Sequence, residues 1–105
     1  RSFHARRDFV LGRLNGIEGV RCPTPEGAFY LFPVVSAFFG SVSPSRRHIE
    51  DSDDLCMYLL EEHNVALVAG SGFGTPEGLR ISYAASMQDL EEAMRRVETG
   101  LKPLK

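Results

Sequence analysis

The 105-residue chain has few of the residues that build metal centres. Its two cysteines, Cys22 and Cys56, are far apart in sequence and lack the close spacing of zinc ribbons and redox motifs. Its three histidines, His4, His48 and His63, are also dispersed. We therefore expect no metal site, and we predict that both cysteines are buried, reduced thiols.

Long apolar runs and concentrated charge are also missing. No stretch reaches the roughly 18 to 20 apolar residues of a membrane span, and the first residues lack the apolar core of a secretory signal. We therefore expect no membrane partner and a cytoplasmic location. The chain has 12 basic and 14 acidic residues, and its Arg-Arg doublets are widely separated, so we expect no nucleic-acid partner.

The composition is that of one globular domain, with 43% hydrophobic and 25% charged residues. Periodicity predicts helices at 1–15, 51–63 and 86–100, and strands at 20–24, 28–32, 65–69 and 79–83. This order favours an α+β layered sandwich. Its sheet is expected to be mixed or mostly antiparallel, with about four strands and with helices mainly on one face.

Two segments carry more specific expectations. Residues 28–32 are apolar throughout, so we predict a central strand that is buried on both faces. Residues 34–50 show no convincing periodicity, so we predict a long connection, of the kind that is often functional.

The ends of the helices carry recognisable signals. Asp51 and Ser52 are both good N-caps for the second helix, and Asn64 is typical of its exit. Ser86 is predicted to cap the third helix, and Gly100 to end it. The apolar side of the second helix is predicted to consist of Leu55, Tyr58, Leu59 and, as a further candidate, Met57.

Arg80 lies inside the last predicted strand, behind a loop with glycines at 70, 72, 74 and 78. A guanidinium stays charged, because its pKa remains above about 12, so it must reach water or an anion. Glycines let a ligand approach the backbone closely. Loop and arginine together predict a site for a carboxylate or phosphate. The alternative is an edge-strand arginine that extends to solvent.

The loop does not match the common nucleotide-binding motifs. Its glycines do not complete G-x-G-x-x-G, and a strand follows where the dinucleotide fold needs a helix. No Gly-Lys-Ser/Thr closes the segment, so a P-loop is excluded as well.

Three segments together resemble one known domain. These are TPEGAFYLFP at 24–33, VALVAGSGFGTPEGLRISYA at 65–84 and SMQDLEEAMRRV at 86–97. They are similar to the C-terminal small domain of class I/II aminotransferases, the fold-type I pyridoxal-phosphate enzymes related to aspartate aminotransferase. The resemblance implies that 1–105 is a single domain and a fragment of a larger aminotransferase, with 1–16 as the end of the interdomain helix.

The resemblance also implies roles for individual residues. In such enzymes the arginine after the glycine loop binds the α-carboxylate of the amino-acid substrate, and Arg80 stands at the matching position. Phe73 and the backbone of Ser71 and Gly72 are implied to shape the wall beside it, and Phe29 is a weaker candidate. For Phe29 and Phe73, packing in the core is an equal alternative.

Pyridoxal phosphate is the implied cofactor of the full-length protein. The only lysines here, Lys102 and Lys105, lie in the tail and do not resemble the family's Schiff-base motif. The large-domain groups that hold the cofactor's ring, nitrogen and phosphate have no counterparts. We therefore expect no catalytic or cofactor-binding residue in the fragment, no bound cofactor, and no activity from the fragment alone.

The implied substrates are an amino acid, with aspartate as a first guess, and a 2-oxo acid. The other implied partners are the missing large domain and, for the full-length protein, a second copy in a homodimer. The face that meets the large domain is expected to expose apolar side chains when that domain is missing, so we expect the fragment to self-associate. Two alternatives stay open: a non-enzymatic α+β module that senses a small carboxylate, and a structural domain in which Arg80 is satisfied internally.

Overall fold

The computed structural model describes residues 2–23 and 30–104, with side chains at all of them except 2–4 and 73. Within these residues the helices are α1 (Ser2–Asn15), α2 (Ser52–His63) and α3 (Met87–Leu101). The strands are β1 (Tyr30–Leu31), β2 (Ser41–Val42), β3 (His48–Ile49), β4 (Val68–Ala69) and β5 (Leu79–Ser82). Two 3-10 helices, η1 (Ser36–Phe38) and η2 (Gly70–Phe73), lie in the connections.

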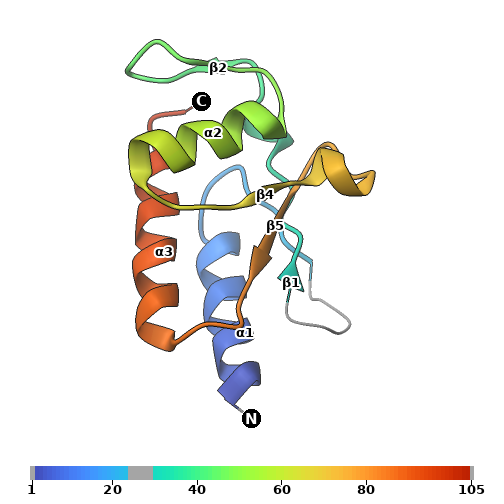
Figure 1. The fold of residues 1–105 in the computed structure, drawn as a ribbon, viewed down its shortest axis with the longest axis vertical. Helices are drawn as coiled ribbons and strands as arrows, with labels where there is room; N and C mark the ends of the chain where they lie inside the picture. The colour runs from blue at the N-terminus through green and yellow to red at the C-terminus, as the bar shows by residue number, and fades with distance from the viewer. Residues whose placement is uncertain (1, 24–29, 105) are drawn as a thin grey trace.

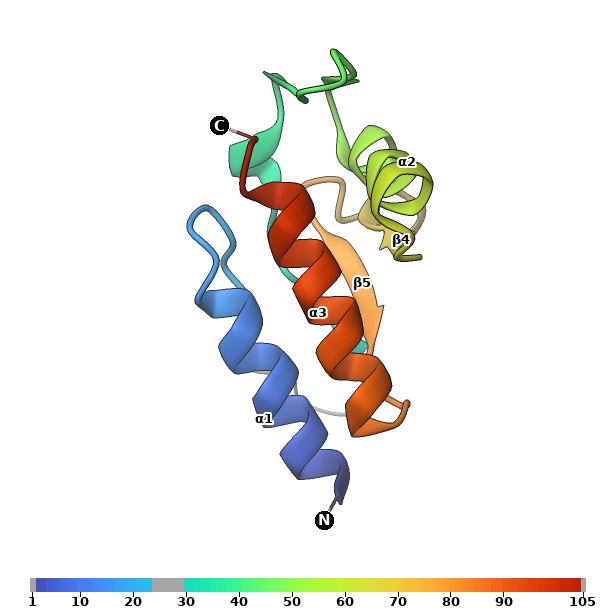
Figure 2. The ribbon, with the colours of Figure 1, turned by 90° about the vertical axis from the view of Figure 1, so that its left-hand side faces the viewer.

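The described strands form two antiparallel sheets. One has three strands in the order β1-β5-β4, and the other is the β2–β3 hairpin. Figures 1 and 2 show α1 and α3 side by side over one face of the larger sheet, with α2 crossing the end of the molecule where the C-terminus lies. The predicted α+β class and antiparallel sheet are confirmed.

The core lies between the larger sheet and the helices. Leu31, Leu79 and Ile81 point inward from the sheet and are at most 4% exposed. The helices contribute apolar residues at helical spacing, which is what an amphipathic helix presents to a core. These residues include Val10, Leu14, Leu55, Leu59, Leu90, Met94 and Val97.

The prediction of a central, doubly buried strand at 28–32 is wrong for the part that the structure describes. β5 is the middle strand, and β1 lies beside it. Leu31 is fully buried, whereas Phe32 is 43% exposed. An unbroken apolar run hides this alternation, because successive side chains still point to opposite faces of a strand. The predicted strand at 20–24 is reduced to a bridge between Arg21 and Val34, with residue 24 outside the described range.

The connection at 34–50 contains η1 and the β2–β3 hairpin, which the sequence did not predict. The Arg46 N–H donates to the Ser43 carbonyl at 2.8 Å, and Arg46 has a φ of 70°. Hairpin turns that need positive φ usually have Gly, Asn or Asp there. Ser43 and Pro44 are typical of the first two positions of a β-turn, but arginine at the position with positive φ does not indicate a hairpin.

Local capping signals were predicted correctly. The Asp51 carboxylate accepts from the Asp54 N–H at 2.8 Å, and Ser86 Oγ accepts from the Asp89 N–H at 3.1 Å. Asn64 ends α2 in the left-handed conformation, with φ 57°. Met57, in contrast, is 48% exposed, so its placement on the apolar side is wrong.

Gly100 does not end α3, which continues through Leu101. Its backbone lies against α2 instead: the Tyr58 hydroxyl donates to the Gly100 carbonyl at 2.8 Å. A β-carbon on Gly100 would lie 2.6 Å from Leu59 Cδ2. The glycine therefore lets α2 and α3 pack closely, which is a tertiary requirement and not a helix stop signal.

Arg13 and Glu98 join α1 to α3 and give the fold a predictable pH dependence. Arg13 Nε and Nη2 donate to the two Glu98 carboxylate oxygens, each at 2.6 Å. These hydrogen bonds hold the pKa of the Glu98 carboxyl below its ordinary value of 4.5. A lowered pKa in the folded state means that the pair stabilises the fold above about pH 4.5 and loses this effect as pH falls.

We expect Glu98→Gln to lower the free energy of unfolding at pH 7 by up to about 1 kcal/mol, because the pair is only partly buried. The difference from the parent should shrink toward pH 3, where the parent carboxylate becomes protonated. Urea unfolding at several pH values measures this. A difference that stays constant from pH 7 to pH 3 would contradict the assignment.

Candidate functional site

Arg80 points away from the core from the middle strand of the larger sheet. β5 alternates buried Leu79 and Ile81 with half-buried Arg80 and exposed Ser82. The register pairs Arg80 with Val68 of β4. Because β5 has a neighbour on each side, the alternative of an edge-strand arginine is wrong.

The side of the sheet that carries Arg80 is referred to below as the outer face. Tyr30 is paired with Ser82, so both point to this side, and continuing the register places Phe32 opposite Arg80. Phe32 and Val68 are each 43% exposed. The outer face consists of Tyr30, Phe32, Val68, Arg80 and Ser82. It therefore surrounds one cation with aromatic and aliphatic side chains.

Tyr30 is the contact that sequence reasoning missed. The Arg80 guanidinium carbon lies 4.4 Å from the centroid of the Tyr30 ring. This distance is within the range of a cation–π interaction. The only sequence signal for Tyr30 is the alternation of inward and outward side chains expected at 30–32. Using it also requires the register between β1 and β5, which no local pattern determines.

The glycines at 70 and 78 lie where two parts of the loop's backbone pack closely against each other. The Gly70 N–H donates to the Gly78 carbonyl at 2.8 Å, and the Thr75 N–H donates to the Gly70 carbonyl at 3.0 Å. A β-carbon on Gly70 would lie 2.5 Å from the Gly78 oxygen and closer still to that of Thr75. These two glycines allow backbone to pack on backbone. The prediction that Gly70 and Gly78 give a ligand access to the backbone is therefore not supported by the structure.

Ser71 and Gly72 lie in η2, directly after β4. Ser71 Oγ donates to Asp53 Oδ2 at 3.0 Å, which ties the loop to the first turn of α2. A β-carbon on Gly72 would meet nothing within 4 Å, so Gly72 is the open position of the loop. Phe29 and the Phe73 side chain lie outside what the structure describes.

The described residues do not fit pyridoxal phosphate. Lys102 is exposed at the C-terminal end of α3, in the helical layer, where it lines a hollow of about 360 Å³ with residues that include Ile17 and Leu104. It is on the helical side of the sheet, whereas Arg80 is on the outer face.

Among the described residues, no three His, Cys, Asp or Glu side chains are grouped to hold a metal ion.

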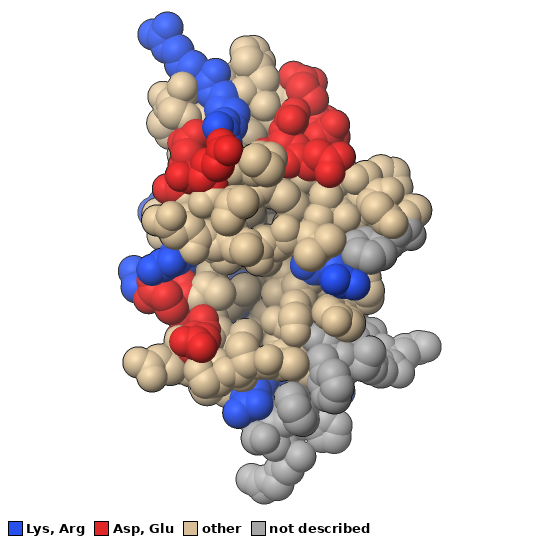
Figure 3. Space-filling model, viewed as in Figure 1, with Lys and Arg blue, Asp and Glu red and all other residues tan. Residues whose placement is uncertain are grey.

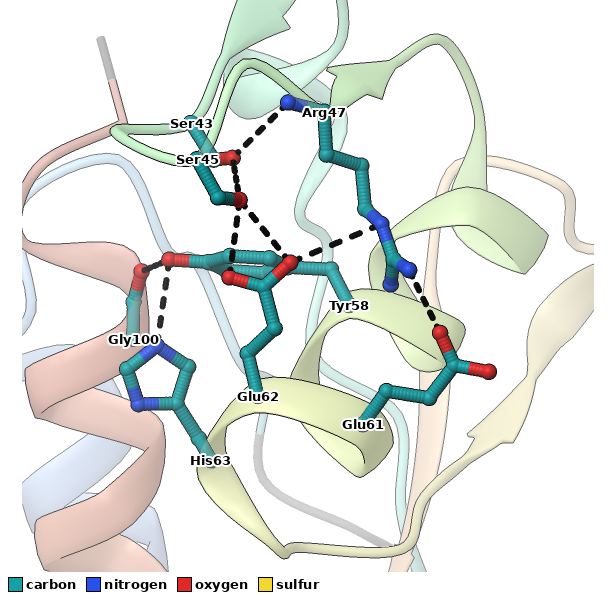
Figure 4. Close-up of polar contacts among 8 residues, drawn as sticks. All are labelled: Ser43, Ser45, Arg47, Tyr58, Glu61, Glu62, His63 and Gly100. Carbon is teal, nitrogen blue, oxygen red and sulfur yellow. Dashed lines mark hydrogen bonds and ion pairs between the residues drawn. The ribbon is translucent and has the colours of Figure 1, made fainter.

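A second polar cluster joins the hairpin, α2 and α3 (Figure 4). Tyr58 donates to Gly100, and His63 Nε2 lies 3.2 Å from the Tyr58 oxygen. Burial raises the pKa of the Tyr58 hydroxyl. On the hairpin side, Ser45 and Arg47 contact Glu62. Apart from the His63–Tyr58 contact, which lies within α2, these contacts link one element to another, so we interpret the cluster as structural.

Both cysteines are buried, as predicted, and burial raises the pKa of the Cys22 and Cys56 thiols to about 11. At pH 8 only about one thiol in a thousand would then be the reactive thiolate. We expect an aromatic disulfide reagent to label the native chain at least tenfold more slowly than the urea-unfolded chain. Equal labelling rates in the two states would contradict the burial of the thiols.

Figure 3 shows that charged side chains gather in clusters on the face seen in Figure 1, mostly toward its margins, while a broad central area is uncharged. The large apolar side chains exposed among the described residues are Phe32, Val42, Met57, Leu60 and Val68. None of the described helices combines the length and apolar character that crossing a bilayer requires.

Comparison with known proteins gives consistent results. The family model for aminotransferase class I and II matches residues 1–97. An aspartate aminotransferase of Rhizobium meliloti (strain 1021) is 48% identical over 96 residues, which are 91% of this chain and 23% of the relative. An aspartate aminotransferase of Pinus pinaster is 44% identical over 101 residues, covering 96% of this chain and 20% of the relative.

Solved structures show the same likeness in three dimensions. The crystal structure of the aspartate aminotransferase from Rhizobium meliloti has a TM-score of 0.95 and 45% identity, over 99% of this chain and 26% of that one. Alanine aminotransferase from Pyrococcus furiosus has a TM-score of 0.81 and 33% identity, over 95% and 24%. The chain thus spans about a quarter of the length of these proteins. On the match over residues 1–97, it belongs to the aminotransferase class I and II family.

Proposed function

We propose that the full-length protein is a pyridoxal-phosphate-dependent aminotransferase and that residues 1–105 form its C-terminal small domain, with 1–16 ending the interdomain helix. It moves an amino group between an amino acid and a 2-oxo acid. The family match and the aspartate aminotransferases among the relatives support this proposal. Because many of the matched relatives are aspartate aminotransferases, aspartate is the first amino donor to test.

Within that protein, Arg80 binds the α-carboxylate of the substrate. The observation that carries this proposal is the outward direction of Arg80 from the middle strand, between partly exposed apolar side chains. A guanidinium in such a setting attracts a carboxylate more strongly than one in bulk water. Two N–H groups of the guanidinium can also form parallel hydrogen bonds to the two carboxylate oxygens, which fixes the orientation of the carboxylate. Ser71, Gly72, Phe73 and Phe29 are the proposed neighbours of the bound substrate.

Arg80 positions the substrate and moves no proton. The cofactor supplies the electron-withdrawing chemistry that makes amino transfer feasible. Since the described residues do not fit pyridoxal phosphate, the groups that bind this cofactor belong to the remainder of the full-length protein. Holding the carboxylate fixes the amino acid relative to that remainder, and orientation of this kind contributes strongly to rate.

The test of the function is an amino-transfer assay with the full-length protein, pyridoxal phosphate, aspartate and 2-oxoglutarate. We expect turnover from the full-length protein. The 105-residue chain under the same conditions should give neither turnover nor a borohydride-reducible cofactor adduct. Activity or a reducible adduct in the short chain would overturn its proposed inertness.

A different assay separates this proposal from a carboxylate-sensing module. A half-site should bind amino acids very weakly, because the rest of the site contributes most of the contacts. Calorimetric titration of the 105-residue chain with aspartate should therefore show no saturable binding in the millimolar range. Saturable binding would favour the sensor.

We propose a homodimer for the full-length protein, located in the cytoplasm, with no membrane or nucleic-acid partner. For the 105-residue chain we expect self-association, because Phe32 and Val68 are partly exposed on the outer face and apolar patches of this kind associate. Sedimentation velocity over a range of concentrations measures it. A monomer at the highest concentration would contradict the expectation.

A further inference from the structure

We propose that Tyr30 is a positioning residue for Arg80: its ring holds the guanidinium in place for the substrate carboxylate. This inference rests on the proposed role of Arg80. The direct observation is the distance of 4.4 Å between the Arg80 guanidinium carbon and the Tyr30 ring centroid. Tyr30 and Arg80 are both half-buried, and they come from adjacent strands.

The sheet fixes the ring relative to the cation. Tyr30 is paired with Ser82, two residues beyond Arg80 on β5, so the Tyr30 and Arg80 side chains are diagonal neighbours on one face. Diagonal neighbours in an antiparallel pair are within reach of aromatic and long side chains. The next residue of β1, Leu31, is fully buried and pairs with Ile81. The position of the ring is therefore set by the core and not by a mobile loop.

An aromatic ring suits this task because it orients a cation without neutralising it. A carboxylate partner would hold the guanidinium too, but it would compete with the carboxylate of the substrate. The face of a ring attracts the positive charge through its quadrupole and leaves the charge available. An arginine side chain has large rotamer entropy, and restricting it before binding reduces the entropy lost when the ligand arrives.

The test uses the full-length protein with Tyr30→Leu and Tyr30→Phe, and with Met57→Leu as a control at an exposed apolar residue of α2, outside the outer face. Phenylalanine keeps the ring, whereas leucine removes it. We expect Tyr30→Leu to lower kcat/KM for the amino donor about tenfold, mainly through a higher KM. Tyr30→Phe and Met57→Leu should stay within about twofold of the parent. Equal losses in Tyr30→Leu and Tyr30→Phe would overturn the inference.

A second measurement does not depend on activity. In the 105-residue chain, the ring current of Tyr30 should shift the side-chain protons of Arg80 upfield in the NMR spectrum. The shift should persist in Tyr30→Phe and disappear in Tyr30→Leu. Arg80 protons at ordinary positions in the parent would overturn the proposed contact, even if Tyr30→Leu fails to fold.

The double variant separates this inference from the proposed function. If Tyr30 acts through Arg80, then adding Tyr30→Leu to Arg80→Leu should cause little further loss of kcat/KM. A full additional tenfold loss would show that Tyr30 acts independently and would overturn the inference alone. If Arg80→Leu itself leaves kcat/KM nearly unchanged, the proposed role of Arg80 fails, whatever the result for Tyr30.

Discussion

Replacing Arg80 by leucine in the full-length protein should lower kcat/KM for amino transfer at least a hundredfold, about 2.7 kcal/mol. Two effects add to give this loss. The substrate carboxylate loses its cationic partner and the hydrogen bonds to it, which are stronger than bonds between neutral groups. The carboxylate is then left unpaired beside the partly exposed apolar side chains of Phe32 and Val68.

Two further variants sharpen the comparison. Arg80→Lys keeps the charge but loses the fork, so its kcat/KM should lie between those of the parent and Arg80→Leu. Arg46→Leu removes an exposed arginine from the hairpin turn and should change kcat/KM less than twofold. A loss of less than about tenfold in Arg80→Leu is too small for a residue that binds the substrate carboxylate, and would contradict the proposal.

Gly70→Ala is expected to destabilise the fold by about 3 kcal/mol or more, at the upper end of what single substitutions cause. The added methyl would meet the carbonyl oxygens of Thr75 and Gly78. Both belong to backbone that is held by hydrogen bonds to Gly70 itself, so neither can withdraw without losing them. Urea unfolding of the 105-residue chain measures the effect.

Gly72→Ala is the matched control from the same loop. A β-carbon there meets nothing within 4 Å, so the change in unfolding free energy should stay within about 0.5 kcal/mol. Similar losses from both substitutions would show that the loop responds to any added side chain. That result would contradict the close backbone packing assigned to Gly70.

Features that depend on neighbouring residues were predictable from the sequence. Asp51 and Ser86 begin their helices by accepting a hydrogen bond from the N–H three residues later, and Asn64 ends α2 with positive φ. In each case the signal and the structure lie within one turn of helix, so the chemistry of a few residues determines the outcome.

Features that depend on distant contacts were not predictable. Gly100 fits a helix stop signal, yet α3 continues, because the glycine is required by close packing against Leu59. The hairpin at 41–49 was missed because Arg46 takes a conformation that usually needs another residue type. The position of β1 beside β5 depends on pairing across about fifty residues, which no local pattern encodes.

The candidate site shows the same division. Arg80 was predicted from its charge, its strand and the loop before it. Tyr30 was not, because its contact with Arg80 exists only once β1 and β5 are paired in register. The side-chain contact of Ser71, whose hydroxyl donates to Asp53 of α2, likewise had no signal in the sequence.

The central claim is that Arg80 binds the α-carboxylate of the substrate. The most direct test is a crystal structure of the full-length protein with pyridoxal phosphate and a non-reacting amino-acid analogue. We predict that both outer nitrogens of the Arg80 fork, or Nε and one of them, lie about 2.7 to 2.9 Å from the two oxygens of the α-carboxylate. An α-carboxylate held by other residues, with the Arg80 guanidinium beyond hydrogen-bonding distance, would contradict it.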